Sequence, residues 1–276
     1  MEDRQTKLVI KLYDSTAGRL LLKIITRPWF SKLAGRILDS SVSRLAIGKF
    51  ITRNNIDMNE YPETEYISFN DFFTRKIKSS LRPVNMDWKA LIAPCDGRLS
   101  ISPITGSGRF DIKGHEYTLE ELIHDKDLAR EYIGGSMLIF RLTVSDYHRY
   151  HYPDSGIKSG NTHIPGVLHT VNPVAAGRRR IYCENSREYF TLQSDNFGKM
   201  LMIQVGALLV GRIFNKHKDS VVVRGLEAGW FEYGGSTVIL CLKPGVARLN
   251  DDISVAAAQH EVPVKMGEPI GICTLR

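Results

Sequence analysis

The feature that most constrains the fold is the spacing of short apolar runs after about residue 60. These runs are separated by Gly, Pro, Asn and Asp, which end strands and form turns. The runs lie at residues 136–144, 200–214, 220–223, 237–242 and 270–275. Many short strands at fairly regular spacing are typical of an antiparallel sandwich or barrel, and not of a doubly wound parallel sheet. The sequence therefore predicts a β-rich body over residues 61–276.

The N-terminal region has a helical pattern instead. Between about residues 16 and 52, apolar residues recur at spacings of three and four with Lys and Arg between them. Pro28 interrupts the pattern, so we expect two helices there. Within the body, residues 119–132 predict one more helix, because Thr118 can cap it and Glu121 follows three residues later. The predicted fold class is α+β, with a helical region over residues 1–60 and a β-rich sandwich-like or barrel-like body.

The positive charge of the chain is concentrated in this helical region. The whole chain carries a formal charge of +7, and residues 1–60 hold eleven Lys or Arg against six Asp or Glu. A basic amphipathic segment with Trp29 and Phe30 at its edge can lie in a membrane interface. The same pattern also fits helices packed on the body with their basic residues in water, and the pattern alone does not decide. We find no zinc-finger spacing, aromatic RNA-binding motif or recognition helix, so we expect an anionic phospholipid surface as partner and no nucleic acid.

The sequence also suggests where the protein resides. No stretch approaches the roughly 18 uncharged apolar residues that a membrane-spanning helix requires. The N-terminus lacks the apolar core of a signal peptide, so we expect a location in the cytosol or on the cytosolic face of a membrane. The cysteines are far apart and form no Cys-x-x-Cys pair, which predicts reduced thiols and neither a disulfide framework nor a zinc site. They are Cys95, Cys183, Cys241 and Cys273.

Two Gly-Gly-Ser sequences precede apolar runs, at residues 134–136 and 234–236. Two glycines allow a sharp bend at a peptide bond, and the following hydroxyl can attack the carbonyl just before it. Local chemistry does not distinguish the two sequences, and each also fits a simple turn that leads into a strand. The second is followed by Thr237. Upstream of it lie segments that carry a carboxylate and two imidazoles, Pro94-Cys95-Asp96-Gly97 and Asp146-Tyr147-His148-Arg149-Tyr150-His151-Tyr152-Pro153.

These segments together resemble the phosphatidylserine decarboxylases. The resemblance runs in collinear order over roughly residues 65–276 and includes further segments: Asn70-Asp71-Phe72-Phe73-Thr74-Arg75-Lys76, Arg82-Pro83, Val171-Asn172-Pro173, Val205-Gly206-Ala207 and Met266-Gly267-Glu268-Pro269-Ile270-Gly271. The family cuts its own chain at a Gly-Ser bond near the C-terminus. The resemblance therefore implies cleavage between Gly235 and Ser236, and it leaves residues 134–136 as a turn that opens a strand.

The resemblance implies a covalent pyruvoyl cofactor made from Ser236. The hydroxyl attacks the preceding carbonyl, and the resulting ester breaks by β-elimination. Gly235 becomes a free C-terminus, and the dehydroalanine left at position 236 hydrolyses to the pyruvoyl group with release of ammonia. A β chain of residues 1–235 and an α chain of residues 236–276 result. The pyruvoyl ketone forms a Schiff base with the substrate amine and accepts the electron pair left when CO2 departs.

The resemblance also assigns roles to the site residues. Ser236 is the nucleophile, His151 the base that activates it, and Asp96 the acid that orients the base. We assign His148 to protonate the carbanion after CO2 loss. The two histidines are three residues apart, which places them on opposite faces of a strand but on one face of a helical turn, and the sequence leaves this open. No third ligand is spaced for a metal, so we expect none.

The resemblance thus implies a proenzyme that becomes a pyruvoyl-dependent phosphatidylserine decarboxylase, with phosphatidylethanolamine and CO2 as products. We expect a peripheral protein on the cytoplasmic face of the cell membrane that binds phosphatidylserine in an anionic membrane. A homodimer is one possible assembly. One alternative keeps the chemistry but uses a soluble amino acid as substrate. Another is a non-enzymatic membrane-binding protein with a degenerate site, against which the intact set of Asp96, His148, His151 and Ser236 argues.

Overall fold

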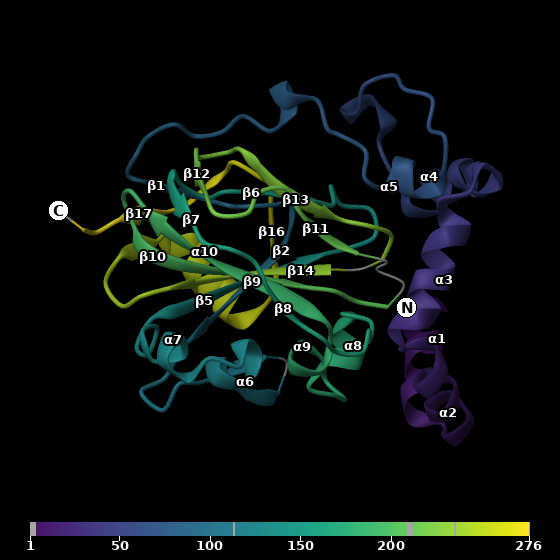
Figure 1. Cartoon of the computed structure of the whole chain (residues 1–276), viewed down its shortest axis with the longest axis horizontal. Helices are drawn as coiled ribbons and strands as arrows, with labels where there is room; N and C mark the ends of the chain where they lie inside the picture. Colours follow the sequence, from purple (N-terminus) through teal and green to yellow (C-terminus); the bar gives the residue numbers. More distant parts are fainter. Residues whose placement is uncertain (1–3, 113, 209–211, 235, 276) are drawn as a thin grey trace.

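A computed structural model describes residues 4–112, 114–208, 212–234 and 236–275. Antiparallel strands form the body, and a row of helices from the N-terminal region stands along one end of it (Figure 1). The α+β class predicted from the sequence is confirmed. None of the helices in the described part of the chain is long and apolar enough to cross a membrane.

The N-terminal region is helical over most of its length. Its elements are α1 (Arg4–Asp14), α2 (Thr16–Ile25), α3 (Pro28–Leu38), a 3₁₀ turn η1 (Ser41–Ala46) and α4 (Ile47–Asn54). The break expected at Pro28 is confirmed, because this residue is the first of α3, where a proline costs no helical hydrogen bond. Helix α1 precedes the pattern at residues 16–52 but lies within the predicted helical region, and η1 and α4 follow where the pattern indicated only two helices. Ser15 separates α1 from α2. It caps the N-terminus of α2, because its side-chain oxygen accepts a hydrogen bond from the Gly18 amide.

These helices bury mostly small residues and leave most of their large apolar ones exposed. The fully covered positions of α2 and α3 are Gly18, Leu22, Ser31 and Gly35. Large apolar side chains remain between 47% and 61% exposed: Leu20, Leu21, Ile24, Trp29, Leu33 and Ile37. A helix packed only on a protein core shows the reverse arrangement. The helices therefore do pack on the body, and a second, apolar face is left in contact with solvent.

The largest sheet in the described ranges has nine strands, and its neighbouring strands pair antiparallel. Its order is β12 (Ser220–Val222), β7 (Gly156–Lys158), β9 (Arg187–Ser194), β10 (Gly198–Val205), β14 (Ser236–Leu242), β5 (Ser136–Leu142), β2 (Gly97–Pro103) and β16 (Val262–Val264), with β8 (Thr162–Ile164) beside β9. Strand β14 is buried at every residue. It lies between β10 and β5, so the segment that begins at Ser236 forms an inner strand near the middle of this sheet.

Smaller sheets complete the body. They are β11 (Ile213–Asn215) with β13 (Glu227–Phe231) and β6 (Arg149–His151); β1 (Ala90–Ile92) with β17 (Pro269–Cys273) and β15 (Ala247–Leu249); and β3 (Arg109–Ile112) with β4 (His115–Thr118). Short helices fill the edges: α5 (Phe69–Phe73), α6 (Leu119–Ile123), α7 (Lys126–Arg130), α8 (Pro173–Ala176), α9 (Ile181–Glu184) and α10 (Asp251–Gln259), with 3₁₀ turns η2 (Met58–Glu60) and η3 (Ser79–Leu81).

Two expectations about individual elements need correction. The helix predicted over residues 119–132 is two short helices, α6 and α7, because His124 adopts a left-handed conformation with φ of 55° and ends the first. Its capping box of Thr118 and Glu121 is confirmed. The apolar run at 200–214 is likewise not one strand, since β10 ends at Val205 and β11 begins at Ile213.

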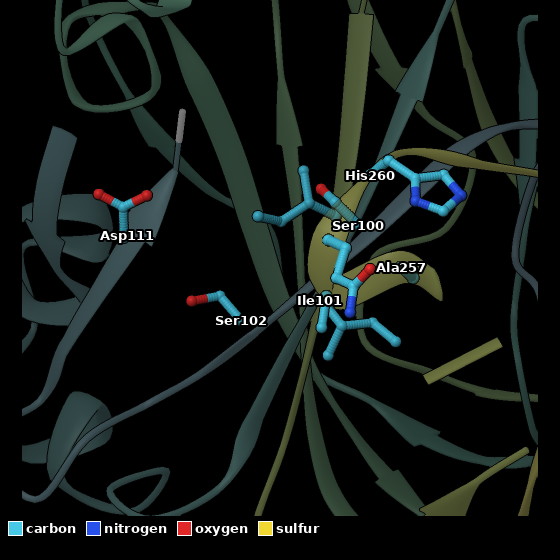
Figure 2. Close-up of a pocket in the computed structure, with 9 residues that line it drawn as sticks. Ser100, Ile101, Ser102, Asp111, Ala257 and His260 are labelled. Atoms are coloured by element: carbon cyan, nitrogen blue, oxygen red, sulfur yellow. The ribbon is translucent and has the colours of Figure 1, made fainter. Parts of the chain in front are cut away.

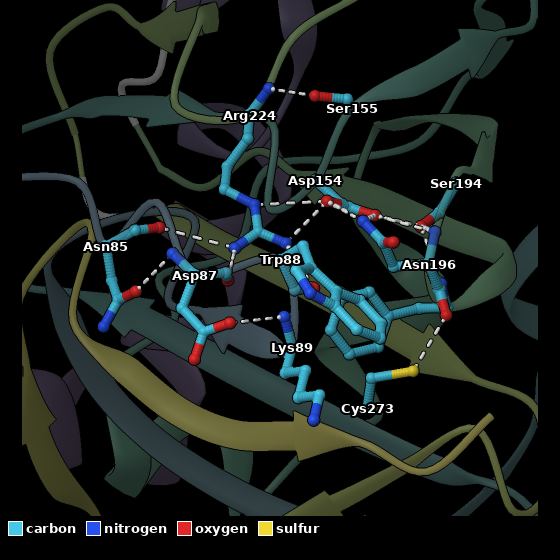
Figure 3. Close-up of polar contacts among 11 residues, drawn as sticks. Asn85, Asp87, Trp88, Lys89, Asp154, Ser155, Ser194, Asn196, Arg224 and Cys273 are labelled. Carbon is cyan, nitrogen blue, oxygen red and sulfur yellow. Dashed lines mark hydrogen bonds and ion pairs between the residues drawn. The ribbon is translucent and has the colours of Figure 1, made fainter. Parts of the chain in front are cut away.

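A buried ion pair ties a loop to the body. Arg224 donates from Nη2 to Asp154 Oδ1 at 2.7 Å, and both side chains are under 5% exposed. The guanidinium also donates to backbone carbonyls of residues 85, 87 and 88, while the carboxylate accepts from Ser194 and Asn196 (Figure 3). This network fixes the segment that leads into β1.

We expect Asp154→Ala to destabilise the protein by about 3–5 kcal/mol, because it leaves the Arg224 charge buried without its partner. Urea unfolding in a Ser236→Ala background, which keeps the chain uncut, measures the free energy of unfolding. The matched control is Asp127→Ala, which breaks an ion pair whose side chains are 60% and 91% exposed. That change should cost less than about 1 kcal/mol. Equal losses in the two variants would contradict the role given to the buried pair.

Candidate active site

Ser236 is the first residue of β14, and its side chain is wholly buried. It pairs with Leu142 of β5. Gly234 has φ of 137°, a conformation that side chains rarely adopt, so the turn into the strand requires a glycine there. The other half of the predicted scissile bond, Gly235, lies outside the described residues. The end of the sheet at which β14 begins faces α1 to α3 (Figure 1).

His148 is the imidazole that contacts this serine. Its Nδ1 lies 3.2 Å from Ser236 Oγ, and its Nε2 lies 2.8 Å from the carbonyl oxygen of Thr143. Because a carbonyl can only accept, Nε2 carries the proton and Nδ1 presents its lone pair to the hydroxyl. Burial, with a smaller effect from the charge of Arg75, lowers the pKa of His148 to about 3, although the hydrogen bond to Thr143 opposes this shift. The ring is therefore neutral near pH 7 and able to accept a proton.

His151 lies on β6, and the backbone between the two histidines is extended. Its amide donates to the carbonyl of Pro94 at 2.7 Å, which holds β6 against the Asp96 segment. Its Nδ1 is buried without a hydrogen-bond partner, and within the described residues no hydrogen bond joins the ring to Ser236. Burial lowers the pKa of His151 to about 4, although the charges of Glu227 and Asp96 oppose this shift. The structure thus brings His148, and not His151, to the hydroxyl.

Asp96 is buried near His151 but binds an arginine. The Arg82 fork donates from Nε and Nη2 to the two carboxylate oxygens at 2.8 and 2.6 Å. The backbone amide of Met266 donates to Oδ1 at 2.9 Å. A cavity of about 410 Å³ adjoins this cluster, with Arg98 and Asp146 in its wall. No hydrogen bond between Asp96 and His151 is present among the described contacts.

Three residues at this site were missed by the sequence reasoning. Arg82 holds Asp96, Thr143 fixes the His148 tautomer, and the Phe73 ring lies over the imidazole with 4.2 Å between ring centroids. Arg82 and Phe73 both belong to segments that carried the family resemblance, which was the only signal available for them. Thr143 acts through its backbone, so its residue type carries no signal.

The other Gly-Gly-Ser lies at the opposite end of the same strand pair. Ser136 begins β5 and pairs with Leu242, the last residue of β14, whereas Ser236 pairs with the end of β5. Gly134 adopts φ of 80°, which suits the predicted turn into a strand. The antiparallel pairing therefore separates the two serines by the whole length of β14.

Other candidate groups lie outside this chemistry. Burial raises the pKa of the Cys95 thiol well above its usual value, so this cysteine stays protonated. No cluster of three or more His, Cys, Asp or Glu in the described ranges could hold a metal ion. A separate cavity of about 220 Å³ lies between β2 and α10 (Figure 2). Its walls include Ser100, Ser102 and His260 but none of the predicted site residues.

Comparison with known proteins gives the class of this fold and site. The profile of the family described as "Phosphatidylserine decarboxylase" matches residues 69–272. The chain belongs to this family, as its sequence motifs indicated.

Relatives match along nearly the whole chain. Phosphatidylserine decarboxylase proenzyme 2 of Clostridium acetobutylicum is 44% identical over 94% of this chain and 90% of its own length. The proenzyme of Clostridium perfringens is 41% identical with the same coverage. That of Ruminiclostridium cellulolyticum is 40% identical over 97% of this chain and 91% of its own.

Proposed function

We propose that this phosphatidylserine decarboxylase makes its own pyruvoyl cofactor from Ser236 and then converts phosphatidylserine to phosphatidylethanolamine and CO2. The observation that carries the proposal is the buried contact between His148 and Ser236 at the start of the central strand. A serine on an ordinary turn is exposed and has no base. Position 236 instead is enclosed by Leu142 and His148, which fits a small carbonyl group that must be protected from water.

The first reaction needs a base to take the proton from the Ser236 hydroxyl. We assign this role to His151, because the charges of Glu227 and Asp96 stabilise the imidazolium that forms, although the charge of Arg149 opposes them. No hydrogen bond joins His151 to the hydroxyl, so the transfer needs a bridging water. Asp96 then supports the base through its charge, with Arg82 holding the carboxylate in place.

The direct contact favours a second assignment, in which His148 is the base. Its neutral Nδ1 already faces the hydroxyl, and the Thr143 carbonyl fixes that orientation. The charge of Arg75 opposes the positive charge that His148 would then carry. Substitution of each histidine separates the two assignments, and the Discussion gives the expected results.

The second reaction needs an acid at the same position. A pyruvoyl group at position 236 supplies an electron sink for the pair that remains when CO2 departs. His148 lies against this position, so we assign it to return a proton to the substrate carbon. The anionic headgroup of the lipid raises the pKa of a neighbouring imidazole, which favours the protonated form that an acid requires.

The two chains of the mature protein should stay together. The α chain, residues 236–276, contributes β14 to the middle of the nine-stranded sheet, with β10 and β5 of the β chain on its two sides. It also contributes β16 and β17, which pair with β2 and β1. We propose that residues 1–60 form a membrane-associating region and residues 61–276 the catalytic domain. A homodimer stays a prediction.

We propose that the exposed apolar face of α2 and α3 binds the membrane in which the substrate resides. Leu21, Leu33 and their exposed apolar neighbours lie beside basic residues of the same helices and of the link between them: Arg19, Lys23, Arg27, Lys32 and Arg36. Apolar residues flanked by positive charge suit the interface of an anionic bilayer. The location would then be peripheral, on the cytoplasmic face of the cell membrane.

We expect Leu21→Glu and Leu33→Glu each to weaken binding to vesicles of phosphatidylserine and phosphatidylcholine by about tenfold or more, because burial of a leucine is worth about 1.5–3 kcal/mol. Co-sedimentation at low and physiological salt measures binding, which should fall as salt rises. The matched control is Val221→Glu on β12, a residue that is 79% exposed but lies outside the helices. If both leucine variants bind like Val221→Glu, the apolar face does not contact the membrane.

A release assay distinguishes the lipid from a soluble substrate. CO2 should form from phosphatidylserine in vesicles or micelles and not from free serine or other amino acids at the same concentration. Release from a free amino acid alone would assign the same chemistry to a soluble substrate. An absence of release from either, in fully cleaved protein, would favour the non-enzymatic alternative.

A further inference from the structure

Gln204 carries a buried amide that no other described residue binds. The residue lies on β10 with its side chain wholly inaccessible. Neither Oε1 nor Nε2 has a hydrogen-bond partner in the described part of the chain. A buried amide without partners costs about 1–3 kcal/mol, and a methionine of similar volume would avoid that cost. The unpaired amide of Gln204 is explained if a bound ligand supplies its hydrogen-bond partner.

The sheet register places this amide next to the reactive serine. Gln204 pairs with Val238 of β14, so both side chains lie on one face of the sheet. Ser236 is two residues before Val238 and lies on that same face. Diagonal neighbours of this kind are within reach of a long side chain. On its other side Gln204 pairs with Glu188 of β9.

A second sheet covers this face. Asn215 of β11 donates to Glu188 Oε2 at 2.8 Å, and His148, just before β6, contacts Ser236. Both β11 and β6 pair with β13 in the three-stranded sheet. Gln204 therefore lies between Glu188 and Ser236 on the covered face of the large sheet. Each of these two neighbours contacts the covering layer, Glu188 through Asn215 and Ser236 through His148.

A cavity borders this row of residues. It measures about 420 Å³ and lies between α3 and the body, with Lys32, Glu188, Gly206 and Arg212 in its wall. Gly206 follows β10 directly and is two residues from Gln204. The cavity wall therefore includes Glu188, the register partner of Gln204, and the residue that follows β10.

We propose that Gln204 binds the carboxylate of the substrate headgroup, with its Nε2 donating a hydrogen bond to a carboxylate oxygen while the substrate amine is attached at position 236. This inference rests on the function proposed above. A neutral donor suits the task, because the carboxylate loses its charge as CO2 leaves. A cation at this place would stabilise the charged ground state more than the transition state, and so slow the reaction.

The test compares a lipid that has the carboxylate with one that lacks it. Phosphatidylserine and phosphatidylethanolamine share the amine, but only the first carries a carboxylate. Borohydride reduction followed by mass spectrometry measures the covalent adduct of each lipid with the α chain. In Gln204→Met we expect the adduct with phosphatidylserine to need an about tenfold higher lipid concentration, the loss typical of one hydrogen bond to a charged group. The adduct with phosphatidylethanolamine should not change.

Two further measurements separate substrate binding from a structural role. Gln204→Met should cut itself at the wild-type rate, and in the uncut Ser236→Ala background its Tm should rise by a few degrees, because the unpaired amide is gone. The matched control is Met202→Leu, a buried residue on the same face of β10. It should leave the preference between the two lipids unchanged.

The proposal is overturned if Gln204→Met affects both lipids equally, or if it lowers the Tm or stops self-cleavage, since the amide would then serve the fold. Gln204→Leu, which also removes the amide, should repeat the selective loss. These outcomes differ from failure of the proposed function. In that case the wild-type protein itself would form no reducible adduct with either lipid.

Discussion

Ser236→Ala is expected to yield a single uncut chain without decarboxylase activity. The substitution removes the hydroxyl that attacks the preceding carbonyl, and it removes the atoms from which the pyruvoyl group forms. The residue is wholly buried at the start of β14, and alanine fits the same space, so the fold should remain. Denaturing gel electrophoresis measures cleavage, and release of CO2 from phosphatidylserine measures activity. Activity should fall to the background of the assay.

Ser136→Ala is the matched control for this result. It changes the serine of the other Gly-Gly-Ser, which begins β5 and lies at the far end of the same strand pair. This variant should be cut and active like the wild-type protein. Cleavage that survives in Ser236→Ala and disappears in Ser136→Ala would show that the wrong serine has been assigned.

The second large effect concerns the two histidines. We expect His151→Ala to stop or greatly slow self-cleavage, because the hydroxyl loses its base, and loss of such a group costs several orders of magnitude in rate. We expect His148→Ala to be cut and to form a reducible adduct with the substrate at position 236. Its turnover should fall by about 10²–10⁴-fold, the usual contribution of a general acid. Gel time courses, adduct trapping and CO2 release distinguish these steps.

Asp96→Asn extends this test to the carboxylate. The change removes the negative charge beside His151 while keeping the shape of the side chain, so cleavage should slow. Thr143 offers no side-chain control, because it holds His148 through its carbonyl. An uncut His148→Ala together with a normally cut His151→Ala would reverse the two assignments. That result would make the 3.2 Å contact between His148 and Ser236 the catalytic one for cleavage.

Much of the architecture could be predicted because it depends on local pattern. The turn at Gly134, the helix start at Pro28 and the capping box at Thr118 each follow from a few neighbouring residues. The break at His124 could not be predicted, because only tertiary packing holds a histidine in a left-handed conformation.

The site could be predicted only as a set of residues. Spacing along the chain could not show which histidine contacts Ser236, since that depends on how β6 lies against the start of β14. The Arg82 bond to Asp96 and the unpaired amide of Gln204 are likewise products of long-range packing. Composition did indicate a basic amphipathic region, but the exposure of Leu21 and Leu33 required the structure.

The intact mass of the purified protein tests the central claim most directly. The account predicts two chains, a β chain that ends at Gly235 and an α chain of residues 236–276. The measured mass of the α chain should be lower, by the mass of one ammonia, than the mass calculated for residues 236–276 with an N-terminal serine. The reason is that a ketone replaces the N-terminal amine. One uncut chain, a cut at any other bond, or an α chain with an intact N-terminal serine would contradict the account.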